Sequence, residues 1–462
     1  MIPLSLAAIA EITGARLDQV ADPGGQVTGP VVIDSRDAVA GGLFAALPGE
    51  HVDGHDFAAA AVAAGAVAVL ASRPAGVPAL ITPDVPAALG RIARAVVAAL
   101  PGLTIAAITG SVGKTTTKDL AAQLTECLGP VIAPHGSYNN EIGHPLTVLR
   151  ASEHTRYLVL EVSARKPGDI TRLCETAPPQ IGVVLRVGHA HAGEFGGLAE
   201  VARAKGELPA ALPPNGVALL NADDPLVRGM AARTEARVVT FGLGADATVR
   251  AADVRTDSQG RPAFTLITPE GWAPVRLRLF GEHNVANALA AAALARELGA
   301  GLAQLADGLC AATPRSKWRM EVTERPDGVT VINDAYNANP EAMAAAIATL
   351  AVMAKDRRAF AVLGPMYELG SQSRQRHEEA GGLAARAGVA GLIVVGEEAA
   401  PMLAGAKADR SWRGELLQVP DAPSAVAALG NLLAPGDVVL VKASRSAGLE
   451  RVAQALTGEA GQ

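Results

Sequence analysis

The stretch AAITGSVGKTTTKDL, residues 106–120, joins an apolar run to a group of glycines, lysines and threonines. Glycines let backbone N–H groups approach phosphate oxygens, and the start of a following helix adds the positive end of its dipole. A lysine at this place can reach β- and γ-phosphates, and the next threonine hydroxyl can ligate Mg²⁺. The stretch therefore predicts a nucleotide-binding loop. The predicted contacts are Gly110, Ser111, Val112, Gly113, Lys114, Thr115 and Thr116.

The loop is shorter at its entry than the common phosphate-binding pattern G-x-x-x-x-G-K-[ST]. Counted back from Lys114, the first glycine of that pattern would stand where the chain has Ile108. The flanking elements still suit such a loop, because residues 104–109 indicate a buried strand and residues 115–129 a helix. An ordinary strand–turn–helix junction is the alternative, but Gly, Lys and two Thr in succession at the helix start favour phosphate binding.

The bulk composition limits the classes of protein to consider. A chain of 462 residues with 49% apolar residues can form about two to four packed domains and is not typical of disorder. The net charge is −6 and the sequence has no dense Lys/Arg run, which argues against a nucleic-acid partner. Cys127, Cys174 and Cys310 are far apart in sequence, which predicts buried thiols in a reducing compartment.

The apolar segments do not predict export or membrane insertion. The N-terminal stretch MIPLSLAAIAEITGARL has no basic start and carries Glu11 inside its apolar part, so it does not fit a signal peptide. Runs such as VAALPGLTIAAITG are interrupted by Pro and Gly and are too short to span a bilayer. The sequence therefore predicts a cytoplasmic protein with no stable membrane insertion.

Strand-like runs alternate with alanine-rich helical runs, which predicts the α/β class with parallel sheets. We divide the chain into residues 1–100, 101–313 and 314–462, and the last block has a Rossmann-like pattern. Sites in such folds gather at the carboxyl ends of strands, so the polar residues after each strand are the candidates. The main predicted strands lie within residues 65–72, 78–82, 103–109, 156–163, 180–188, 216–221, 328–336, 359–364, 391–396 and 437–444.

The loop form T-G-S-x-G-K-T-T resembles that of the Mur ligase superfamily. Four further stretches carry the likeness over essentially the whole chain, and D-A-Y-N-A-N-P is the most specific motif among them. The stretches are IDSRDAVAGGLFAALPGEHVDGHDF, SYNNEIGHPLTVL, WRMEVTERPDGVTVINDAYNANPEAM and VLVKASRS. The resemblance implies an N-terminal UDP-sugar-binding domain, a central ATP-binding domain with the phosphate loop, and a Rossmann-like C-terminal domain that binds the incoming dipeptide and closes on ATP.

Within the superfamily, the stretches are most similar to the ligase that adds D-alanyl-D-alanine to UDP-N-acetylmuramoyl-tripeptide in peptidoglycan precursor synthesis. Joining a carboxylate to an amine is uphill in water, and ATP drives it by forming an acyl phosphate that the amine attacks. Such an enzyme must hold Mg-ATP, align the carboxylate and neutralise developing charge. The resemblance therefore implies ATP and Mg²⁺ as cofactors, and we expect a monomer.

Hard oxygen ligands are expected around Mg²⁺, and Glu161 at the end of a strand is the best-placed carboxylate after the phosphate loop. The resemblance makes Glu161 a metal ligand, together with Thr115 and His191. It also implies that Lys205 is carbamylated by CO₂ and ligates a second Mg²⁺; an unmodified lysine that contacts phosphate or solvent is the alternative. By contrast, His189 matches no functional position and is expected to be structural.

The remaining site residues also follow from the resemblance. Asn284 and Asn287 lie three apart on one helix face, and an amide can both donate to and accept from adenine. Asp334 would contact ribose, Tyr336 would stack on adenine, and Arg319 would reach the γ-phosphate from the third domain. The expected substrate contacts are Ser35 and Arg36 for UDP, Asn139 and Asn140 for the substrate or phosphate, and Asn337, Asn339, Lys442 and Ser444 for the dipeptide or peptidyl group.

Some positions depart from the family's usual residues. LEVSARKPGDI stands where relatives usually read E-M-G-A, Arg186 replaces a usual Asn, and Pro365 replaces a usual Glu near the expected site of the acceptor amine. A paralogue that adds a different dipeptide or a single amino acid is therefore one alternative. A second alternative, from another class, is an ATPase or switch that turns over ATP without forming an amide.

Overall fold

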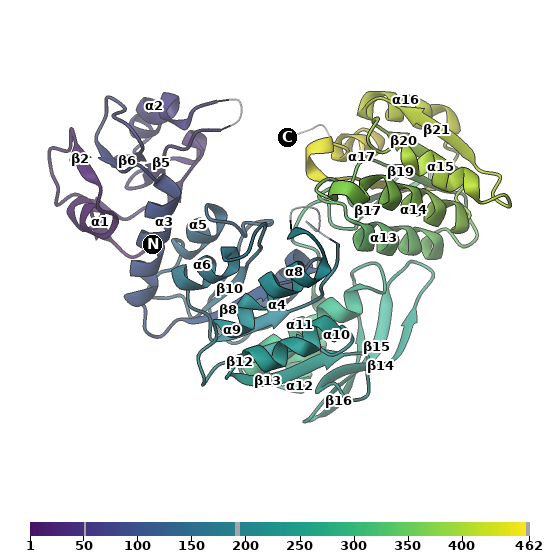
Figure 1. Cartoon of the computed structure of the whole chain (residues 1–462), viewed down its shortest axis with the longest axis horizontal. Coiled ribbons are helices and arrows are strands. Elements are labelled where there is room, and N and C mark those ends of the chain that lie inside the picture. The colour runs from purple at the N-terminus through teal and green to yellow at the C-terminus, as the bar shows by residue number, and fades with distance from the viewer. Residues whose placement is uncertain (50–51, 190–194, 459–462) are drawn as a thin grey trace.

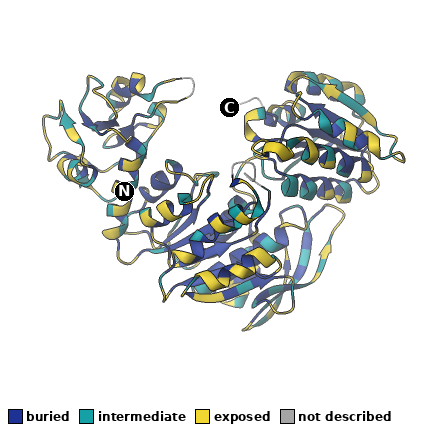
Figure 2. Cartoon of the chain, viewed as in Figure 1, coloured by how far each residue is buried: buried dark blue, intermediate teal, exposed yellow. Residues whose placement is uncertain are grey.

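The computed structural model describes residues 1–49, 52–189 and 195–458, which form three α/β units in chain order. Figure 1 shows them as an arc, with the purple N-terminal unit and the green-yellow C-terminal unit on either side of the teal central unit. Each unit is built around its own main sheet. The strands are mostly buried, and the helices around them present exposed faces (Figure 2).

The first unit has a five-stranded sheet in the order β2-β7-β6-β5-β4, in which β2 is antiparallel and the other strands are parallel. Leu43, Val69 and Leu80 of this sheet are completely buried. Asp84 begins α3 by accepting a hydrogen bond from the backbone N–H of Ala87 at 2.9 Å. The elements are β1 (Leu4–Ser5), α1 (Leu6–Thr13), β2 (Arg16–Asp18), β3 (Gln26–Val27), β4 (Val31–Val32), η1 (Ser35–Asp37), β5 (Leu43–Ala45), η2 (Gly54–Phe57), α2 (Ala58–Ala63), β6 (Ala68–Ala71), β7 (Ala79–Ile81) and α3 (Val85–Ala98).

Helix α3 connects the first unit to the central one through a buried contact. Its Leu89, Ile92 and Val96 belong to one apolar cluster with Leu103 and Ile105 at the start of the central sheet. Burial of such side chains contributes about 1.5–3 kcal/mol each. The first unit is therefore held by shared core packing in addition to its covalent connection.

The central unit has a nine-stranded sheet in the order β16-β15-β14-β13-β12-β11-β8-β10-β9. Strands β8 to β14 pair in parallel, and β15 and β16 continue the sheet as antiparallel strands. The elements are β8 (Thr104–Thr109), α4 (Lys114–Thr125), β9 (Val131–Ile132), α5 (Gly143–Val148), β10 (Tyr157–Glu161), α6 (Asp169–Thr176), β11 (Ile181–Val184), α8 (Leu198–Lys205), α9 (Glu207–Ala210), β12 (Val217–Asn221), α10 (Pro225–Arg228), η3 (Gly229–Arg233), β13 (Arg237–Gly242), β14 (Val249–Thr256), β15 (Pro262–Thr268), β16 (Gly271–Arg276), α11 (Asn284–Glu297) and α12 (Leu302–Ala311).

Helices α4 and α11 pack against each other beside this sheet. Helix α11 is buried along most of its length, and Ala288, Ala291 and Ala295 are completely buried. Small side chains permit close approach of the two helices and of the underlying strands. This packing brings the start of α11 against the loop that precedes α4.

The third unit has a six-stranded sheet in the order β17-β18-β22-β19-β20-β21, parallel except for β17. Asn339 caps α13 by accepting a hydrogen bond from the N–H of Ala342 at 2.8 Å. The elements are β17 (Glu321–Glu324), β18 (Thr330–Asn333), α13 (Pro340–Met353), β19 (Ala359–Leu363), η4 (Gly370–Gln372), α14 (Ser373–Arg386), β20 (Gly391–Val395), α15 (Pro401–Ala408), β21 (Glu415–Val419), α16 (Ala422–Leu432), β22 (Val438–Lys442), η5 (Arg445–Ala447) and α17 (Glu450–Thr457).

The predicted α/β class is confirmed, since every main strand predicted from the sequence coincides with a strand of one of the three sheets. Within residues 1–49, 52–189 and 195–458, the helices all fall short of the length and apolar character that a membrane crossing requires.

Candidate active site

The predicted nucleotide-binding loop joins the carboxyl end of β8 to the start of α4. Gly113 has φ 84°, in the left-handed region, and a Cβ there would lie 2.3 Å from Oδ1 of Asn287. A Cβ on Gly110 would lie 2.9 Å from Cβ of Leu185, so both glycines permit close packing around the loop. Lys114 extends back along the loop and its Nζ donates to the carbonyl oxygen of Gly110 at 2.9 Å. The backbone of the loop therefore has the form of a phosphate-binding loop, and the side chain of Lys114 points toward that loop.

The charges around Lys114 are close enough to affect one another. Burial lowers the pKa of the Lys114 ammonium, the Glu161 carboxylate opposes this shift, and the Arg319 guanidinium adds to it. Lys205, at the end of α8, is only 3% exposed. Burial, and then the charge of Lys114, lower the pKa of Lys205 to about 7. Several cations thus face one region that also holds a carboxylate, as expected of a site for a polyanion.

Glu161 is held at the end of β10 by two hydrogen bonds and is 1% exposed. Thr115 donates from Oγ1 to Oε2 at 2.9 Å, and Asn139 donates from Nδ2 to Oε1 at 2.7 Å. Ser137 adds a hydroxyl contact to Oγ1 of Thr115 at 2.8 Å. These contacts bring a carboxylate and two hydroxyl groups together beside Lys114.

Arg319 reaches this cluster from the third unit. Its Nη2 donates to Oγ1 of Thr115 and to Oγ of Ser137, each at 3.3 Å. Its guanidinium carbon lies 4.3 Å from the ring centre of Tyr336. Its Nε is buried without a hydrogen-bond partner among the described residues. A guanidinium with an unused donor at this position fits a site that binds additional anionic oxygens.

The backbone around Arg319 is strained. Trp318 and Met320 have φ of 59° and 50°, which costs roughly 1–2 kcal/mol for each non-glycine residue. Two hydrogen bonds from the end of β18 hold this conformation: Asp334 Oδ1 accepts from the N–H of Met320 at 3.0 Å, and the N–H of Tyr336 donates to the Trp318 carbonyl at 3.2 Å. This strained backbone conformation therefore directs the side chain of Arg319 toward the phosphate loop.

A pocket of about 220 Å³ lies where the loop, the start of α11 and the third unit meet. Asn284 and Asn287 line it together, and Nδ2 of Asn287 donates to Oδ1 of Asn284 at 2.8 Å. Asp334 and Lys442 of the third unit also line it, and Nζ of Lys442 forms an ion pair with Oδ2 of Asp334 at 2.5 Å. The predicted adenine and ribose residues are thus brought together, apart from Tyr336, which lines a second pocket instead.

Lys442, which was predicted to contact the substrate, is almost completely buried. It is 2% exposed, and its Nζ also donates to the carbonyl oxygen of Asn337 at 2.8 Å. Burial lowers the pKa of Lys442, while the carboxylate of Asp334 opposes the shift. The ion pair fixes the ends of β18 and β22 to each other beside the smaller pocket.

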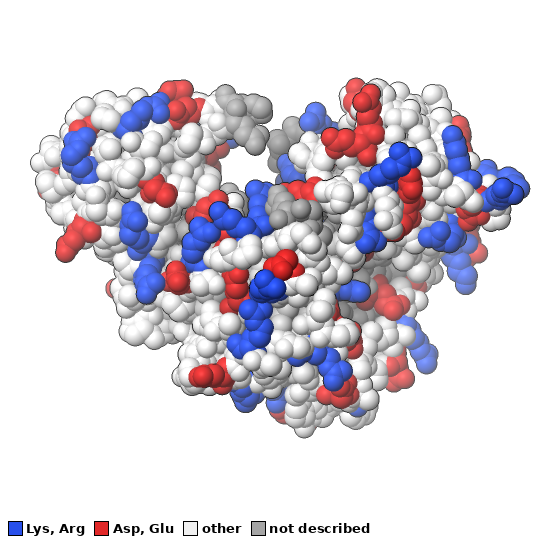
Figure 3. Space-filling model, viewed as in Figure 1, with Lys and Arg blue, Asp and Glu red and all other residues white. Residues whose placement is uncertain are grey.

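The second pocket, of about 970 Å³, opens between the central and third units. Lys114, Glu161 and Arg319 lie among its lining residues, so it shares Arg319 with the smaller pocket. Figure 3 shows Lys and Arg side chains gathered on the central unit where it faces the space between the outer units. The predicted substrate residues that line the pocket are Asn139, Asn140, Asn337, Asn339 and Ser444, and its basic residues also include Arg165, Lys166, Arg172 and Arg445.

Some of these residues already have local partners. Oδ1 of Asn140 accepts from the N–H of Gly143 at 2.9 Å, as in an ordinary Asx turn, and Oδ1 of Asn337 accepts from its neighbour's N–H at 2.9 Å. Asn339 caps α13, and its Nδ2 approaches the Ser111 carbonyl oxygen at 3.5 Å. Ser444 accepts from the N–H of Tyr367 at 3.0 Å.

Two predicted residues are not part of this assembly, and a third cannot be placed. Ser35 and Arg36 lie on η1 of the first unit and line neither of the two pockets. Arg36 is paired with Asp34 at 2.5 Å. His191 lies outside the described residues.

The structure also places residues at the site that the sequence alone did not single out. Ser137 binds both Thr115 and Arg319, and Glu341 lines the smaller pocket. Burial would raise the pKa of the Glu341 carboxyl, but hydrogen bonds from His189 lower it. Ser137 opens the SYNN stretch and Glu341 follows D-A-Y-N-A-N-P, so their positions beside two distinctive motifs were the available signal.

The oxygen atoms of Glu161 and Thr115 beside the phosphate loop suit a hard cation such as Mg²⁺. Within the described parts of the chain, no group of three or more His, Cys, Asp or Glu side chains is arranged to hold a metal ion. Mg²⁺ does not need such a cage, because it commonly binds through one or two carboxylates, waters and substrate phosphates. Glu161 and the Thr115 hydroxyl supply oxygen donors next to the loop, so the residues fit Mg²⁺ bound together with a nucleotide.

Comparisons with known proteins agree with this geometry over the whole chain. Residues 30–109 match the family description "Mur ligase family, catalytic domain", residues 108–295 match "Mur ligase middle domain", and residues 318–445 match "Mur ligase, glutamate ligase domain". A UDP-N-acetylmuramoyl-tripeptide–D-alanyl-D-alanine ligase of Mycobacterium tuberculosis is 48% identical, over 99% of this chain and 98% of the relative.

Two solved structures have the same architecture. A crystal structure of MurF from Acinetobacter baumannii has a TM-score of 0.86 and 31% identity, covering 99% of both chains. MurF from Thermotoga maritima, crystallised in complex with ADP, has a TM-score of 0.79 and 30% identity, covering 94% of this chain and 98% of that one. The sequence identity over full length, the fold and the arrangement of the phosphate loop together establish that the chain belongs to the Mur ligase family.

Proposed function

We propose that this enzyme joins D-alanyl-D-alanine to UDP-N-acetylmuramoyl-tripeptide with conversion of ATP to ADP and phosphate, in peptidoglycan precursor synthesis in the cytoplasm. The observation that carries the proposal is the position of Arg319, which lines both pockets and contacts Thr115 of the phosphate loop. A nucleotide in the smaller pocket would direct its terminal phosphate to the larger pocket, where a carboxylate substrate has room to bind.

The reaction has two steps that this site can support. An oxygen of the peptide carboxylate attacks the γ-phosphorus of ATP, ADP leaves, and a mixed acyl phosphate forms. The free amine of the dipeptide then attacks the acyl carbon and loses a proton as inorganic phosphate departs, which leaves a new amide bond. Lys114 and Arg319 neutralise the charge that develops on the transferred phosphoryl group.

The nucleotide contacts divide between two units of the protein. The loop residues Gly110 to Thr116 bind the phosphates through backbone N–H groups, with Lys114 at the β- and γ-positions. Asn284 and Asn287 recognise adenine, and Asp334, paired to Lys442, contacts the ribose side. Tyr336 supports Arg319 with its ring and borders the nucleotide from the larger pocket.

Thr115 and Glu161 would hold Mg²⁺, which when bound supplies positive charge to the phosphate oxygens. His191 and a carbamylated Lys205 complete the proposed metal set, and Asn139 orients Glu161. Lys205 can take up CO₂ because its pKa of about 7 leaves much of the amine neutral near pH 7. The neutral amine attacks CO₂ and loses a proton, which converts a cation into a carboxylate-like group.

Lys205→Met and Lys205→Arg should each reduce dipeptide-dependent phosphate release by at least about a hundredfold, since neither side chain can form the carbamate. The wild type incubated with ¹³C-bicarbonate should show a carbamate carbon signal that both variants lack. The neutral fraction of Lys205 rises as the pH rises through about 7, so carbamate formation should increase from pH 6 to pH 8. Full activity in Lys205→Arg would show that an unmodified cation suffices.

The substrates are proposed to span all three units. Residues 1–100 bind the UDP-sugar end with Ser35 and Arg36, residues 101–313 bind ATP, and residues 314–462 bind the dipeptide and close on ATP. Asn140, Asn337, Asn339 and Ser444 face the peptide in the larger pocket, and Lys442 acts there through the backbone of Asn337. The basic residues of the larger pocket suit a substrate with free carboxylates. We propose that the enzyme acts as a monomer and without nucleic acid.

The test is phosphate release by the purified enzyme with UDP-N-acetylmuramoyl-tripeptide, ATP, Mg²⁺ and a panel of dipeptides and single amino acids. Release should require the tripeptide substrate and should be fastest with D-alanyl-D-alanine, with the amide product seen by mass spectrometry. Preference for another dipeptide or an amino acid would identify a paralogue. ATP turnover without an amide product would contradict the ligase function.

A further inference from the structure

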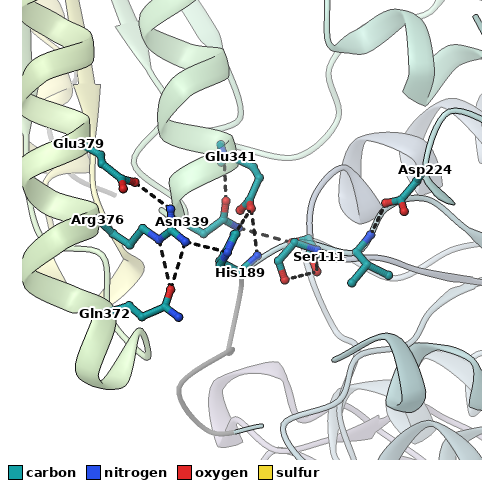
Figure 4. A network of polar contacts seen from close by, with 11 residues as sticks. Ser111, His189, Asp224, Asn339, Glu341, Gln372, Arg376 and Glu379 are labelled. Atoms are coloured by element: carbon teal, nitrogen blue, oxygen red, sulfur yellow. Dashed lines mark hydrogen bonds and ion pairs between the residues drawn. The ribbon is translucent and has the colours of Figure 1, made fainter. Parts of the chain in front are cut away.

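The loop that follows β11 makes a polar contact with the third unit that the proposed chemistry does not use. Figure 4 shows His189 of this loop between Glu341 of α13 and Arg376 of α14. The backbone N–H and Nδ1 of His189 both lie within hydrogen-bond distance of Oε1 of Glu341, at 3.0 and 2.7 Å. One carboxylate oxygen thus binds both the main chain and the side chain of one residue in another unit.

Arg376 fixes the other side of the imidazole. Its Nη2 lies 2.8 Å from Nε2 of His189. A guanidinium can only donate, so Nε2 is the acceptor and the ring hydrogen is on Nδ1, where it is donated to Glu341. Glu379 accepts from Nη1 of Arg376 at 2.8 Å, and Gln372 accepts from Nη2 at 3.2 Å. Arg376 is therefore oriented toward His189 by two neighbours on its own side of the contact.

The same loop is tied to the phosphate loop. The N–H of Gly188 donates to Oγ of Ser111 at 2.8 Å, and that hydroxyl lies 3.1 Å from the Gly188 carbonyl oxygen. A Cβ on Gly188 would lie 2.8 Å from the carboxyl carbon of Glu341, so only glycine permits this approach without a shift. The contacts form a continuous path from Arg376 through His189 and Gly188 to Ser111. Arg376, His189 and Ser111 are labelled in Figure 4.

We infer that His189 is a positioning residue for the ligation reaction: through Glu341 and Arg376 it holds the third unit against the phosphate loop in the placement from which Arg319 reaches Thr115. The inference rests on the proposed function, since it takes the phosphate loop and Arg319 as the parts that act on ATP. His189 does not contact the reacting groups in this account. It sets the distance between two units that each carry one part of the site.

The surroundings of this contact distinguish it from an ordinary surface ion pair. The side chains of His189 and Glu341 are only 22% and 19% exposed, and His189 uses both ring nitrogens and its backbone N–H. Exposed pairs with a single contact contribute little. Here the second carboxylate oxygen of Glu341 is buried and has no hydrogen-bond partner among the described residues. His189 thus supplies two hydrogen bonds to Oε1 of a carboxylate whose other oxygen has none among the described residues.

The first test compares His189→Ala and Arg376→Ala with two control variants. His154 is an exposed histidine of the central unit, and Arg374 is an exposed arginine on the same helix as Arg376. We expect kcat of dipeptide-dependent phosphate release to fall roughly tenfold in each test variant, with KM for ATP changed by less than about twofold. His154→Ala and Arg374→Ala should match the wild type.

Two further variants separate positioning from stability. His189→Asn retains a donor near Glu341 but is too short to reach Arg376, so its kcat should lie between those of the wild type and His189→Ala. The double variant His189→Ala/Arg376→Ala should be no slower than His189→Ala, because both substitutions remove one shared contact. Effects that multiply, or a fall in Tm with unchanged kcat, would overturn the inference.

Hydrogen exchange of the protein without substrates tests the contact independently of the reaction. Backbone exchange in the first turn of α13, including the N–H of Ala342, should be faster in His189→Ala than in the wild type and His154→Ala. If the wild type forms no amide product but this difference is present, the proposed function fails and the contact stands. Unchanged exchange in His189→Ala would overturn the contact.

Discussion

Lys114→Ala should reduce phosphate release by at least roughly a thousandfold at saturating ATP, whichever acceptor is supplied. The ammonium group lies at the start of α4, folded back onto the loop at 2.9 Å from the Gly110 carbonyl oxygen. It is the charge closest in the chain to the glycines that would cradle the phosphates. Its loss removes a contact that strengthens as negative charge moves toward the β–γ bridge, so kcat should fall much more than nucleotide affinity.

The variant should remain folded, which makes the result interpretable. Burial lowers the pKa of Lys114, so the folded protein gains no stability from holding this ammonium in its charged form. Thermal unfolding of Lys114→Ala should therefore give a Tm within a few degrees of the wild type. Lys407→Ala, which changes an exposed lysine on α15, is the matched control and should have wild-type kinetics.

The variant Lys114→Arg tests whether a positive charge at this position is sufficient for phosphate release. An arginine retains the charge but not the compact shape, and it cannot fold back to the Gly110 carbonyl without displacing the loop. We expect this variant to be nearly as slow as Lys114→Ala. A rate close to the wild type in Lys114→Ala would mean that the triphosphate binds elsewhere, and the assignment of both pockets would then be wrong.

The strands that the sequence predicted correctly share one physical property. Strands β8, β10, β19, β20 and β22 are parallel and completely or nearly completely buried, so they are continuous apolar runs in the sequence. The antiparallel extension was missed. Strand β14 alternates buried and partly exposed residues only in its first half, and none of its last four residues is buried. It also contains Arg250 and Arg255, so its sequence resembles a loop as much as a strand.

The edges of the third sheet were missed for the same reason. Strand β17 reads Glu-Val-Thr-Glu and none of its residues is fully buried, because it has only one neighbouring strand. Strand β21, at the other edge, begins at an exposed Glu415. What makes these segments strands is pairing with residues far away in sequence, which no local pattern records.

The site residues also fall into those that the local sequence located and those that it could not locate. Lys114, Glu161 and Asp334 follow or end buried strands, so the rule that sites lie at carboxyl ends located them. The pairing of Lys442 with Asp334 joins residues 108 positions apart, and the contact of Arg319 with Ser137 joins residues 182 apart. Such contacts depend on how two units meet. The same holds for His189, which was expected to be structural because it matches no functional position of the family. Its contacts with Glu341 and Arg376 join residues 152 and 187 positions apart.

Arg319→Ala should lower kcat by about a thousandfold while leaving ATP binding to the central unit nearly unchanged. Arg319 approaches Thr115 and Ser137 from the third unit, whereas the loop and the two asparagines of the smaller pocket belong to the central unit. Its contribution is therefore made when the units are together and the phosphoryl group is in transfer. Single-turnover phosphate release and nucleotide titration separate these two effects.

Arg319→Lys should recover little of this loss. A lysine cannot stack on Tyr336 at the 4.3 Å seen for the guanidinium, and it cannot use two nitrogens to bridge Thr115 and the phosphate. The control is Arg315→Ala, which changes an exposed arginine on the same connecting segment, where it pairs with Glu126 at 2.8 Å. Near-normal single-turnover rates in Arg319→Ala would assign charge neutralisation to Lys114 alone.

The backbone at Arg319 supplies a second reason to expect a large effect. Trp318 and Met320 are held at positive φ by hydrogen bonds to the residues after β18, and this strained segment directs a single side chain to the phosphate loop. If the role of Arg319 were to stabilise the fold, Arg319→Ala should lower Tm, because the positive φ of Trp318 and Met320 would remain without a compensating contact. If it serves catalysis, Arg319→Ala should leave Tm near the wild-type value and lower kcat. Trp318→Gly accepts the positive φ but loses the ring contacts with Tyr336 and Arg445 and loosens the segment, so its kcat should fall as well. A fall in kcat without a matching fall in Tm in Arg319→Ala is therefore the result that links this segment to phosphoryl transfer.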